Sequence, residues 1–168
     1  AQLPNQGPFS IRYPRGNGFL QDWHTPFRKL EIGKGRCLIE GKEIAIISIG
    51  TAGNIAKRAI EKLEHISVAL YDMRFLKPID ETLLHDIFRR FEQVITLEDG
   101  TINGGLGSAV AEFIATHHYP AQLVRLGIPD KFIEHGTQHQ LYAECGFDEK
   151  GIIRCVTALI NQKEGNVI

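Results

Sequence analysis

The sequence predicts an α/β fold: an open, mostly parallel β-sheet with helices on both faces, preceded by an extended N-terminal arm. Two observations predict it. Short apolar runs alternate with segments in which apolar residues recur at helical spacing, as in successive β-α-β units. The first thirty residues instead hold four of the seven prolines and show no helical periodicity. A sheet built by right-handed crossovers is therefore expected to follow an irregular arm.

The chain divides into three expected parts. Residues 1–29 form the arm, residues 30–162 form the α/β domain, and residues 163–168 form a frayed tail. The arm includes a strand-like apolar piece at residues 9–13. Because an independent domain rarely starts with such an arm, we expect the chain to begin within a larger protein.

Four short apolar runs are typical of strands buried on both faces. They occupy residues 44–49, 67–71, 93–97 and 122–126. Before them, residues 30–32 and 36–39 flank Gly33-Lys34-Gly35 and are expected to form an edge strand or a hairpin.

Four helices are expected, each with one apolar face. Their faces comprise Ile55, Ala56, Ala59, Ile60 and Leu63; Leu83, Leu84, Ile87, Phe88 and Phe91; Leu106, Ala109, Val110, Phe113 and Ile114; and Ile152, Ile153, Val156, Leu159 and Ile160. Asp80 and Asp148 stand where N-caps of the second and fourth helices belong.

Composition excludes several function classes. A formal charge of −1 argues against broad electrostatic attraction to nucleic acid or to an anionic membrane. No apolar run has the length needed to span a bilayer. The chain has three cysteines, an odd number, and no C-x-x-C motif, which argues against a framework of disulfides. We therefore expect no nucleic-acid partner, no membrane partner and a reducing, cytoplasmic location.

Charged residues gather where the expected strands end, and ligands of open α/β sheets bind beyond those ends. Asp72 and Glu98 are the acidic residues there, and Arg74 and Lys77 are the basic ones. These side chains either form an anion or acid/base site, or pair with one another and fix loops at the sheet rim.

The third expected helix opens with the glycine-rich residues 103–108 (NGGLGS). Backbone N–H groups at such a start can hold a phosphate. The segment is neither G-x-G-x-x-G nor a P-loop, because Val110 replaces the third glycine and no Gly-Lys-Ser/Thr follows. Close packing of helix against sheet is the alternative explanation of the glycines.

The histidines give weak signals. His135 and His139 are four residues apart and would share a face on a helix, as zinc ligands do, but the glutamate of H-E-x-x-H is absent and Gly136 favours a turn before a helix. His65, His85 and the pair at 117–118 are expected at the surface or rim. No Ser or Cys nucleophile has a base at a telling spacing.

The arm carries the segment RYPRGNG at residues 12–18. Pro14 restricts its own φ and the conformation of Tyr13, so Arg12 and Arg15 lie on a stiffened backbone. A guanidinium held in this way suits bidentate phosphate contact, and an exposed basic linker is the alternative. In an extended chain Arg12 and Arg15 face opposite sides and therefore do different jobs.

Taken together, an ordered series of motifs resembles the C-terminal part of the 1-deoxy-D-xylulose-5-phosphate synthase family. The resemblance covers residues 7 to 160, and the motifs are RYPRGNG (12–18), YDMRFLKPID (71–80), TLEDG (96–100), GGLGSAV (104–110) and GIPDKFIEHG (127–136). The second and fourth of these also occur in related thiamine-diphosphate enzymes, whereas the first and last are more specific.

The resemblance implies an enzyme that joins pyruvate to D-glyceraldehyde 3-phosphate with loss of carbon dioxide, in isoprenoid and thiamine precursor synthesis. It implies thiamine diphosphate and magnesium as cofactors, a homodimer, and residues 1–29 as the exit of a preceding pyrimidine-binding domain. It implies Arg15 as the contact to the phosphate of the aldehyde substrate, with Arg12 as a structural neighbour.

The family's cofactor motif, Gly-Asp-Gly followed by an asparagine, is absent, and residues 98–100 (EDG) do not replace it. We therefore expect no catalytic, cofactor-binding or metal-binding residue in this chain, and no turnover by it alone.

Two alternatives remain. The chain could belong to another thiamine-diphosphate enzyme, such as the β subunit of a 2-oxo acid dehydrogenase or a transketolase. It could also be a free-standing α/β module that binds a small anion at Arg74 and the helix start at 104–107.

Overall fold

A computed structural model describes residues 7, 8, 10, 11, 13, 18, 26 and 28–165, the last three of them by backbone alone. Five strands form one sheet: β1 (Arg36–Ile39), β2 (Ile44–Ile49), β3 (Val68–Asp72), β4 (Gln93–Thr101) and β5 (Gln122–Ile128). Five helices accompany them: α1 (Ala52–Ile60), α2 (Glu81–Arg90), α3 (Leu106–His117), α4 (Gln138–Glu144) and α5 (Glu149–Gly165).

The strands lie in the order β1-β3-β2-β4-β5. The pairs β3–β2, β2–β4 and β4–β5 are parallel, and only β1 runs antiparallel, against β3. The carboxyl ends of four strands therefore meet at one rim. Because β1 is reversed, its first residue, Arg36, lies opposite Asp72 at that same rim.

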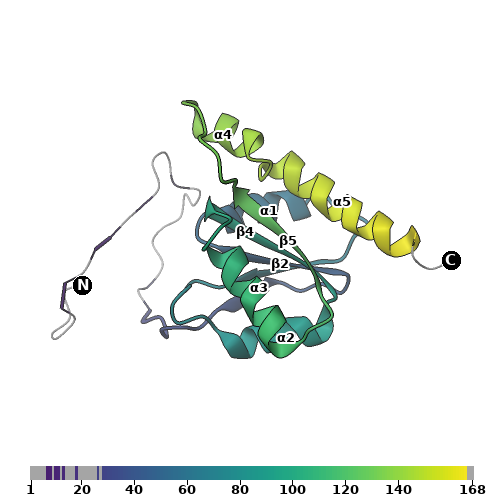
Figure 1. The fold of residues 1–168 in the computed structure, drawn as a ribbon, viewed down its shortest axis with the longest axis horizontal. Coiled ribbons are helices and arrows are strands. Elements are labelled where there is room, and N and C mark those ends of the chain that lie inside the picture. The colour runs from purple at the N-terminus through teal and green to yellow at the C-terminus, as the bar shows by residue number, and fades with distance from the viewer. Residues whose placement is uncertain are drawn as a thin grey trace.

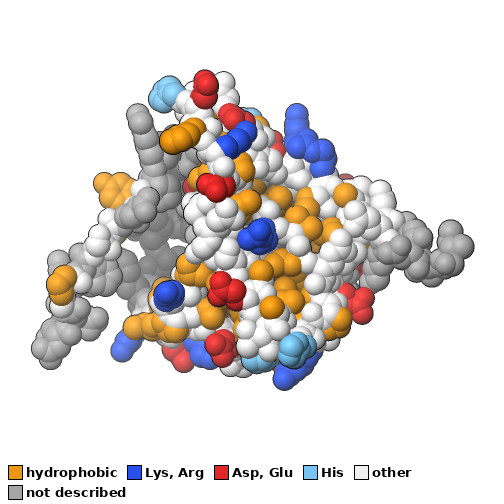
Figure 2. Space-filling view, viewed as in Figure 1, with side chains coloured by type: hydrophobic (Ala, Val, Ile, Leu, Met, Phe, Trp, Pro, Cys, Tyr) orange, Lys and Arg blue, Asp and Glu red, His pale blue; other side chains and the backbone are white. Residues whose placement is uncertain are grey.

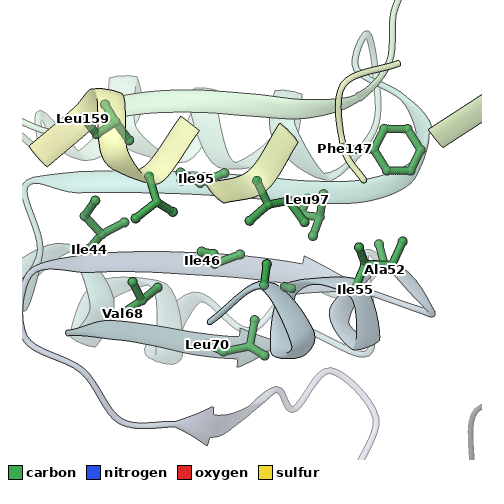
Figure 3. Close-up of a cluster of buried hydrophobic side chains, with 14 residues drawn as sticks. Ile44, Ile46, Ala52, Ile55, Val68, Leu70, Ile95, Leu97, Phe147 and Leu159 are labelled. Carbon is green, nitrogen blue, oxygen red and sulfur yellow. The ribbon is translucent and has the colours of Figure 1, made fainter. Parts of the chain in front are cut away.

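Apolar side chains on the two faces of the sheet form two cores. One lies under α1 and α5, and Figure 3 shows strand residues such as Ile46 and Leu97 directed into it with Leu159 of α5. The other lies under α2 and α3 and includes Leu84 and Val110. Figure 1 shows α5 and α1 toward the top of the view and α2 and α3 toward the bottom. The expected α/β fold with helices on both faces is confirmed.

Most expected elements appear with small shifts. The edge strand forms at residues 36–39, whereas residues 30–32 stay outside it, so no hairpin forms. Both expected N-caps are present: Asp80 accepts the Leu83 N–H at 3.1 Å, and Asp148 accepts the Gly151 N–H at 2.8 Å. The last helix runs to Gly165 and thus past residue 162.

The expected end of the third run at residue 97 is wrong in a way that matters for function. β4 continues to Thr101, so Glu98 and Asp99 belong to a strand and not to the loop after it. Successive strand residues point to opposite faces, and the two carboxylates therefore enter different surroundings.

The surface carries charge of both signs. On the face seen in Figure 2, Lys and Arg side chains alternate with Asp and Glu, and hydrophobic side chains show along the middle, where β5 forms the edge of the sheet. This mixture agrees with the formal charge of −1.

Candidate functional site

The topology places one crevice at the carboxyl rim. The chain leaves β2 through α1 onto one face and leaves the neighbouring β4 through α3 onto the other. In open α/β sheets, ligands bind where the connections of adjacent strands diverge in this way. Thr51 follows β2 and Asp99 belongs to β4, so these two residues flank the crevice.

Tyr142 of α4 lies at this crevice. Its hydroxyl donates to Asp99 Oδ2 at 2.6 Å and accepts from Gln138 Nε2, also at 2.6 Å. Desolvation, followed by the hydrogen bond and the charge of Asp99, raises the pKa of Tyr142 to about 12, while hydrogen bonds from Gln138 and Thr51 act in the opposite direction. At neutral pH the phenol is therefore protonated and bound to the carboxylate.

A capping box fixes the helix that presents Tyr142. The Thr137 hydroxyl accepts the Gln140 N–H at 3.4 Å, and Gln140 Oε1 accepts the Thr137 N–H at 3.0 Å. Without this reciprocal pair a helix of 7 residues would have little stability of its own.

A groove of about 920 Å³ opens beside Tyr142. Apolar side chains such as Ile128, Leu141 and Phe147 provide most of its wall, and Asp99 and His135 provide polar groups. The groove has the size and polarity of a small-molecule site. Among the described residues that line the groove, Cys145 is the one cysteine, and burial raises its pKa, so its thiol is not an activated nucleophile.

A second polar cluster lies at the same rim, after β3. Asp72 Oδ2 lies 3.0 Å from Arg36 Nη2 and 3.9 Å from Arg74 Nε, and Asp72 Oδ1 accepts the Arg74 N–H at 3.1 Å. Arg74 has φ +57°, a left-handed conformation that is uncommon for residues other than glycine and that is often found at functional sites. The expected pairing of Asp72 with Arg74 is confirmed, and Arg36 is an additional partner that the spacing did not indicate.

Glu98, the other acidic residue expected at the rim, does not take part in this cluster. Its side chain is 6% exposed and accepts the N–H groups of Leu106 and Gly107 at 2.9 and 2.8 Å. These are the first two N–H groups of α3, which attract a negative charge. The chain's own carboxylate thus occupies the place proposed for a phosphate.

The glycines at the start of α3 are explained by packing. A Cβ at Gly105 would lie 2.0 Å from Glu98 Oε2, and a Cβ at Gly107 would lie 2.9 Å from Thr96 Oγ1 and from Arg125 Cδ. The alternative hypothesis of a free-standing module placed a small anion at Arg74 and at this helix start. Because Glu98 occupies the helix start, only Arg74 is left to bind such an anion.

The histidines do not assemble into a metal site. His135 precedes α4 and His139 lies within it, so the turn before a helix that Gly136 favoured is confirmed and the two histidines share no helix face. His85 Nδ1 lies 2.7 Å from the Tyr119 hydroxyl and packs against the His117 ring. Within residues 28–162, no group of three or more His, Cys, Asp or Glu side chains could hold a metal ion. The described residues therefore offer no cluster of carboxylates that fits magnesium.

The arginines of the arm, Arg12 and Arg15, lie outside the described residues. Sequence reasoning missed Tyr142 and Arg36, which the fold brings to the rim from segments far from Asp99 and Asp72 in the chain.

The three cysteines are free. Among the described helices, none is both long enough and apolar enough to cross a membrane.

Curated relatives cover nearly all of this chain. A protein named 1-deoxy-D-xylulose-5-phosphate synthase from Bacteroides fragilis is 52% identical over 160 residues, which is 94% of this chain and 25% of the relative. Proteins of the same name from Bacteroides thetaiotaomicron and Cytophaga hutchinsonii are each 54% identical over 92% and 95% of this chain. The chain spans about a quarter of the length of these relatives.

Solved structures agree on the fold. A split gene transketolase, described as an inactive beta4 tetramer, matches with a TM-score of 0.71 and 34% identity over 78% of this chain and 43% of that one. A transketolase from Leishmania mexicana matches with a TM-score of 0.57 and 14% identity over 77% of this chain and 18% of that one, which shows the fold alone.

The family model for the transketolase C-terminal domain matches residues 33–152. The match begins just before β1 and ends within α5, so it covers every strand of the sheet. The chain therefore belongs to the transketolase C-terminal domain family.

Proposed function

We propose that this chain is the C-terminal part of a 1-deoxy-D-xylulose-5-phosphate synthase. This enzyme condenses pyruvate with D-glyceraldehyde 3-phosphate and releases carbon dioxide. The observation that carries the proposal is 52–54% identity to proteins of that name over more than nine tenths of the chain. We infer that residues 30–162 are its transketolase-like domain and that residues 1–29 lead out of a pyrimidine-binding domain.

In this proposal Arg15 contacts the phosphate of the aldehyde substrate. Support comes from the segment RYPRGNG, whose proline restricts the backbone that carries the guanidinium. Arg74 supports the same chemistry from the described rim, since it places a second guanidinium there, 3.9 Å from Asp72 Oδ2.

The remaining properties of the synthase belong to the proposal as well. Thiamine diphosphate and magnesium would be bound by parts of the synthase that carry the Gly-Asp-Gly motif, because this chain lacks it. A homodimer is supported by β5, an edge strand whose Leu123, Val124 and Leu126 are only partly buried. Three free cysteines fit a reducing cytoplasm.

A transketolase is the second candidate. The 34% identity to the split gene transketolase favours it, and the shared fold is equally compatible with it. The higher identity to the synthases and the presence of RYPRGNG weigh against it.

The test compares two acceptor substrates in the synthase that contains this chain. Arg15→Ala is expected to lower kcat/KM for D-glyceraldehyde 3-phosphate about tenfold to hundredfold, since a charge-assisted contact contributes about 1.5–3 kcal/mol. The same variant should leave kcat/KM for unphosphorylated glyceraldehyde nearly unchanged. Arg12→Ala is the matched control and should affect both acceptors alike.

An equal loss for both acceptors in Arg15→Ala would remove the assigned role of Arg15. Absence of carbon dioxide release from pyruvate by the unaltered enzyme would overturn the synthase proposal itself and favour the transketolase.

A further inference from the structure

A second hollow, distinct from the groove at the rim, lies where α1 and α5 meet. It has a volume of about 450 Å³, within the range of small-molecule pockets. Four basic side chains line it: Arg58 and Lys62 from the end of α1 and the turn that follows, and Lys150 and Arg154 from α5. His139 of α4 lies at the same hollow.

The basic residues of the hollow occur as two pairs. Arg58 and Lys62 are four residues apart, and so are Lys150 and Arg154. Lys150 and Arg154 both lie on α5, where like charges at this spacing repel and destabilise a helix. Two such pairs line one hollow in a chain whose formal charge is −1, so the positive charge is concentrated locally.

The acidic side chains in the hollow are already engaged. Asp148 accepts the Gly151 N–H as the N-cap of α5, at 2.8 Å. Glu149 lies between the two cations of the α1 side, with Oε1 2.5 Å from Arg58 Nε and Oε2 2.5 Å from Lys62 Nζ. Contacts with Lys62 and then Arg58 lower the pKa of Glu149, so its carboxylate stays ionised.

The α5 cations have no such neutralisation. Among residues 28–162, neither Lys150 nor Arg154 makes an ion pair, and both side chains are exposed. Lys150 and Arg154 therefore bring two positive charges to the hollow that no described carboxylate pairs with. A single carboxylate held between two cations is also the arrangement that a phosphoryl oxygen pair would adopt there.

We propose that this hollow binds a small anion of the phosphoryl type that carries at least two negative charges, with Lys150 and Arg154 as its contacts and Glu149 as an internal competitor. The proposal is independent of the proposed function, because the hollow shares no residue with the rim except Tyr142. The size of the hollow favours a small molecule over an acidic protein segment.

The test is isothermal titration calorimetry of the full 168-residue chain with inorganic diphosphate at low ionic strength, where surface charges are least screened. We expect saturable one-to-one binding with a Kd of about 1 mM or tighter, and weaker binding of inorganic phosphate. Lys150→Gln and Arg154→Gln should each weaken binding about three- to fivefold, as expected for exposed charge pairs. Circular dichroism checks that the variants remain folded.

Three further variants separate a specific site from general charge attraction. Lys57→Gln removes an exposed cation from the same helix α1 but not from the hollow, and should leave the Kd unchanged. Glu149→Gln removes the competitor and should tighten binding, whereas Glu61→Gln, outside the hollow, should not. The proposal is overturned if the unaltered chain binds no diphosphate, if Lys57→Gln weakens binding as much as Arg154→Gln, or if Glu149→Gln does not tighten it.

Discussion

At the scale of single residues, Tyr142 connects three parts of the chain. Its hydroxyl bonds Asp99 of β4 and Gln138 of its own helix, and its ring centroid lies 4.7 Å from that of Phe147 in the core. The phenol therefore joins the crevice at the rim to the core under α5. It can orient a ligand through Asp99, but it cannot act as a base at neutral pH.

The pKa of Tyr142 gives a prediction for alkaline solution. The folded-state value of about 12 lies above the ordinary value of 10.0, so the unfolded chain loses this proton first as the pH rises. The stabilisation is fully present below pH 10 and is lost as the pH rises toward 12. In urea unfolding between these pH values, the unaltered chain should lose free energy of unfolding more steeply than Tyr142→Phe.

Tyr13, an exposed tyrosine, supplies the control for that experiment. Tyr13→Phe should keep the pH slope of the unaltered chain. Parallel slopes for the unaltered chain and Tyr142→Phe would contradict the raised pKa of Tyr142.

The sequence could not indicate Tyr142 for a physical reason. Asp99 and Tyr142 are 43 residues apart, and α4 carries no buried residue, so its apolar pattern is weak. Asp80 and Asp148 were predictable because an N-cap acts on a backbone group three residues away. The role of Arg36 was not predictable, because the antiparallel pairing of β1 with β3 brings it beside Asp72.

At the scale of elements, the start of α3 depends on one contact between a strand and a helix. Glu98 of β4 fills the space beside Gly105 and satisfies two N–H groups of the helix. The glycines and the carboxylate are therefore one structural unit, and neither can change alone.

Gly105→Ala tests this unit. The new methyl group would lie 2.0 Å from Glu98 Oε2 and 2.6 Å from the Thr101 carbonyl oxygen, and backbone cannot move away cheaply. We expect a loss of about 2–4 kcal/mol in the free energy of unfolding, measured by urea denaturation. Gly18→Ala, which meets no heavy atom within 4 Å, should change it by less than about 0.5 kcal/mol.

If the explanation is steric, Gly105→Ala should lower the free energy of unfolding less in a chain that already carries Glu98→Ala than in the unaltered chain. An equal loss for Gly18→Ala and Gly105→Ala would refute it.

The sequence predicted these elements better than it predicted their ends. The run at 44–49 was recovered without change because Gly50, with φ +68°, ends it. β4 extends beyond its apolar run, which ends at residue 97. It is an interior strand, and its pairing with β5 continues to Thr101 and Ile128 after a register shift. Such pairing is a tertiary effect that apolar spacing does not record.

At the scale of the whole molecule, two cores on opposite faces hold the sheet in place. The alternation of apolar runs and helical faces was sufficient to predict this arrangement, since each face requires a cover. The family was indicated by motifs and not by this arrangement, because many unrelated proteins have a sheet covered by helices on both faces.

A pair of phenylalanines compares core and surface. Phe147 is fully buried and belongs to the core cluster drawn in Figure 3, whereas Phe132 is fully exposed. Phe147→Ala should lower the free energy of unfolding by about 3–5 kcal/mol through lost burial and the cavity left behind. Phe132→Ala should change it by less than about 0.5 kcal/mol. Similar losses in urea denaturation for both variants would contradict the placement of the core.

The reversed direction of β1 has a consequence for how the domain is attached. Arg36, where β1 begins, lies beside Asp72, so the polypeptide enters the sheet on the side where the four parallel strands finish. A parallel first strand of the same 4 residues would have put that entrance roughly 13 Å away, toward the opposite rim. The described segment that leads into β1 therefore lies at the rim that carries Asp72 and Arg74, and Lys34 of that segment pairs there with Asp80.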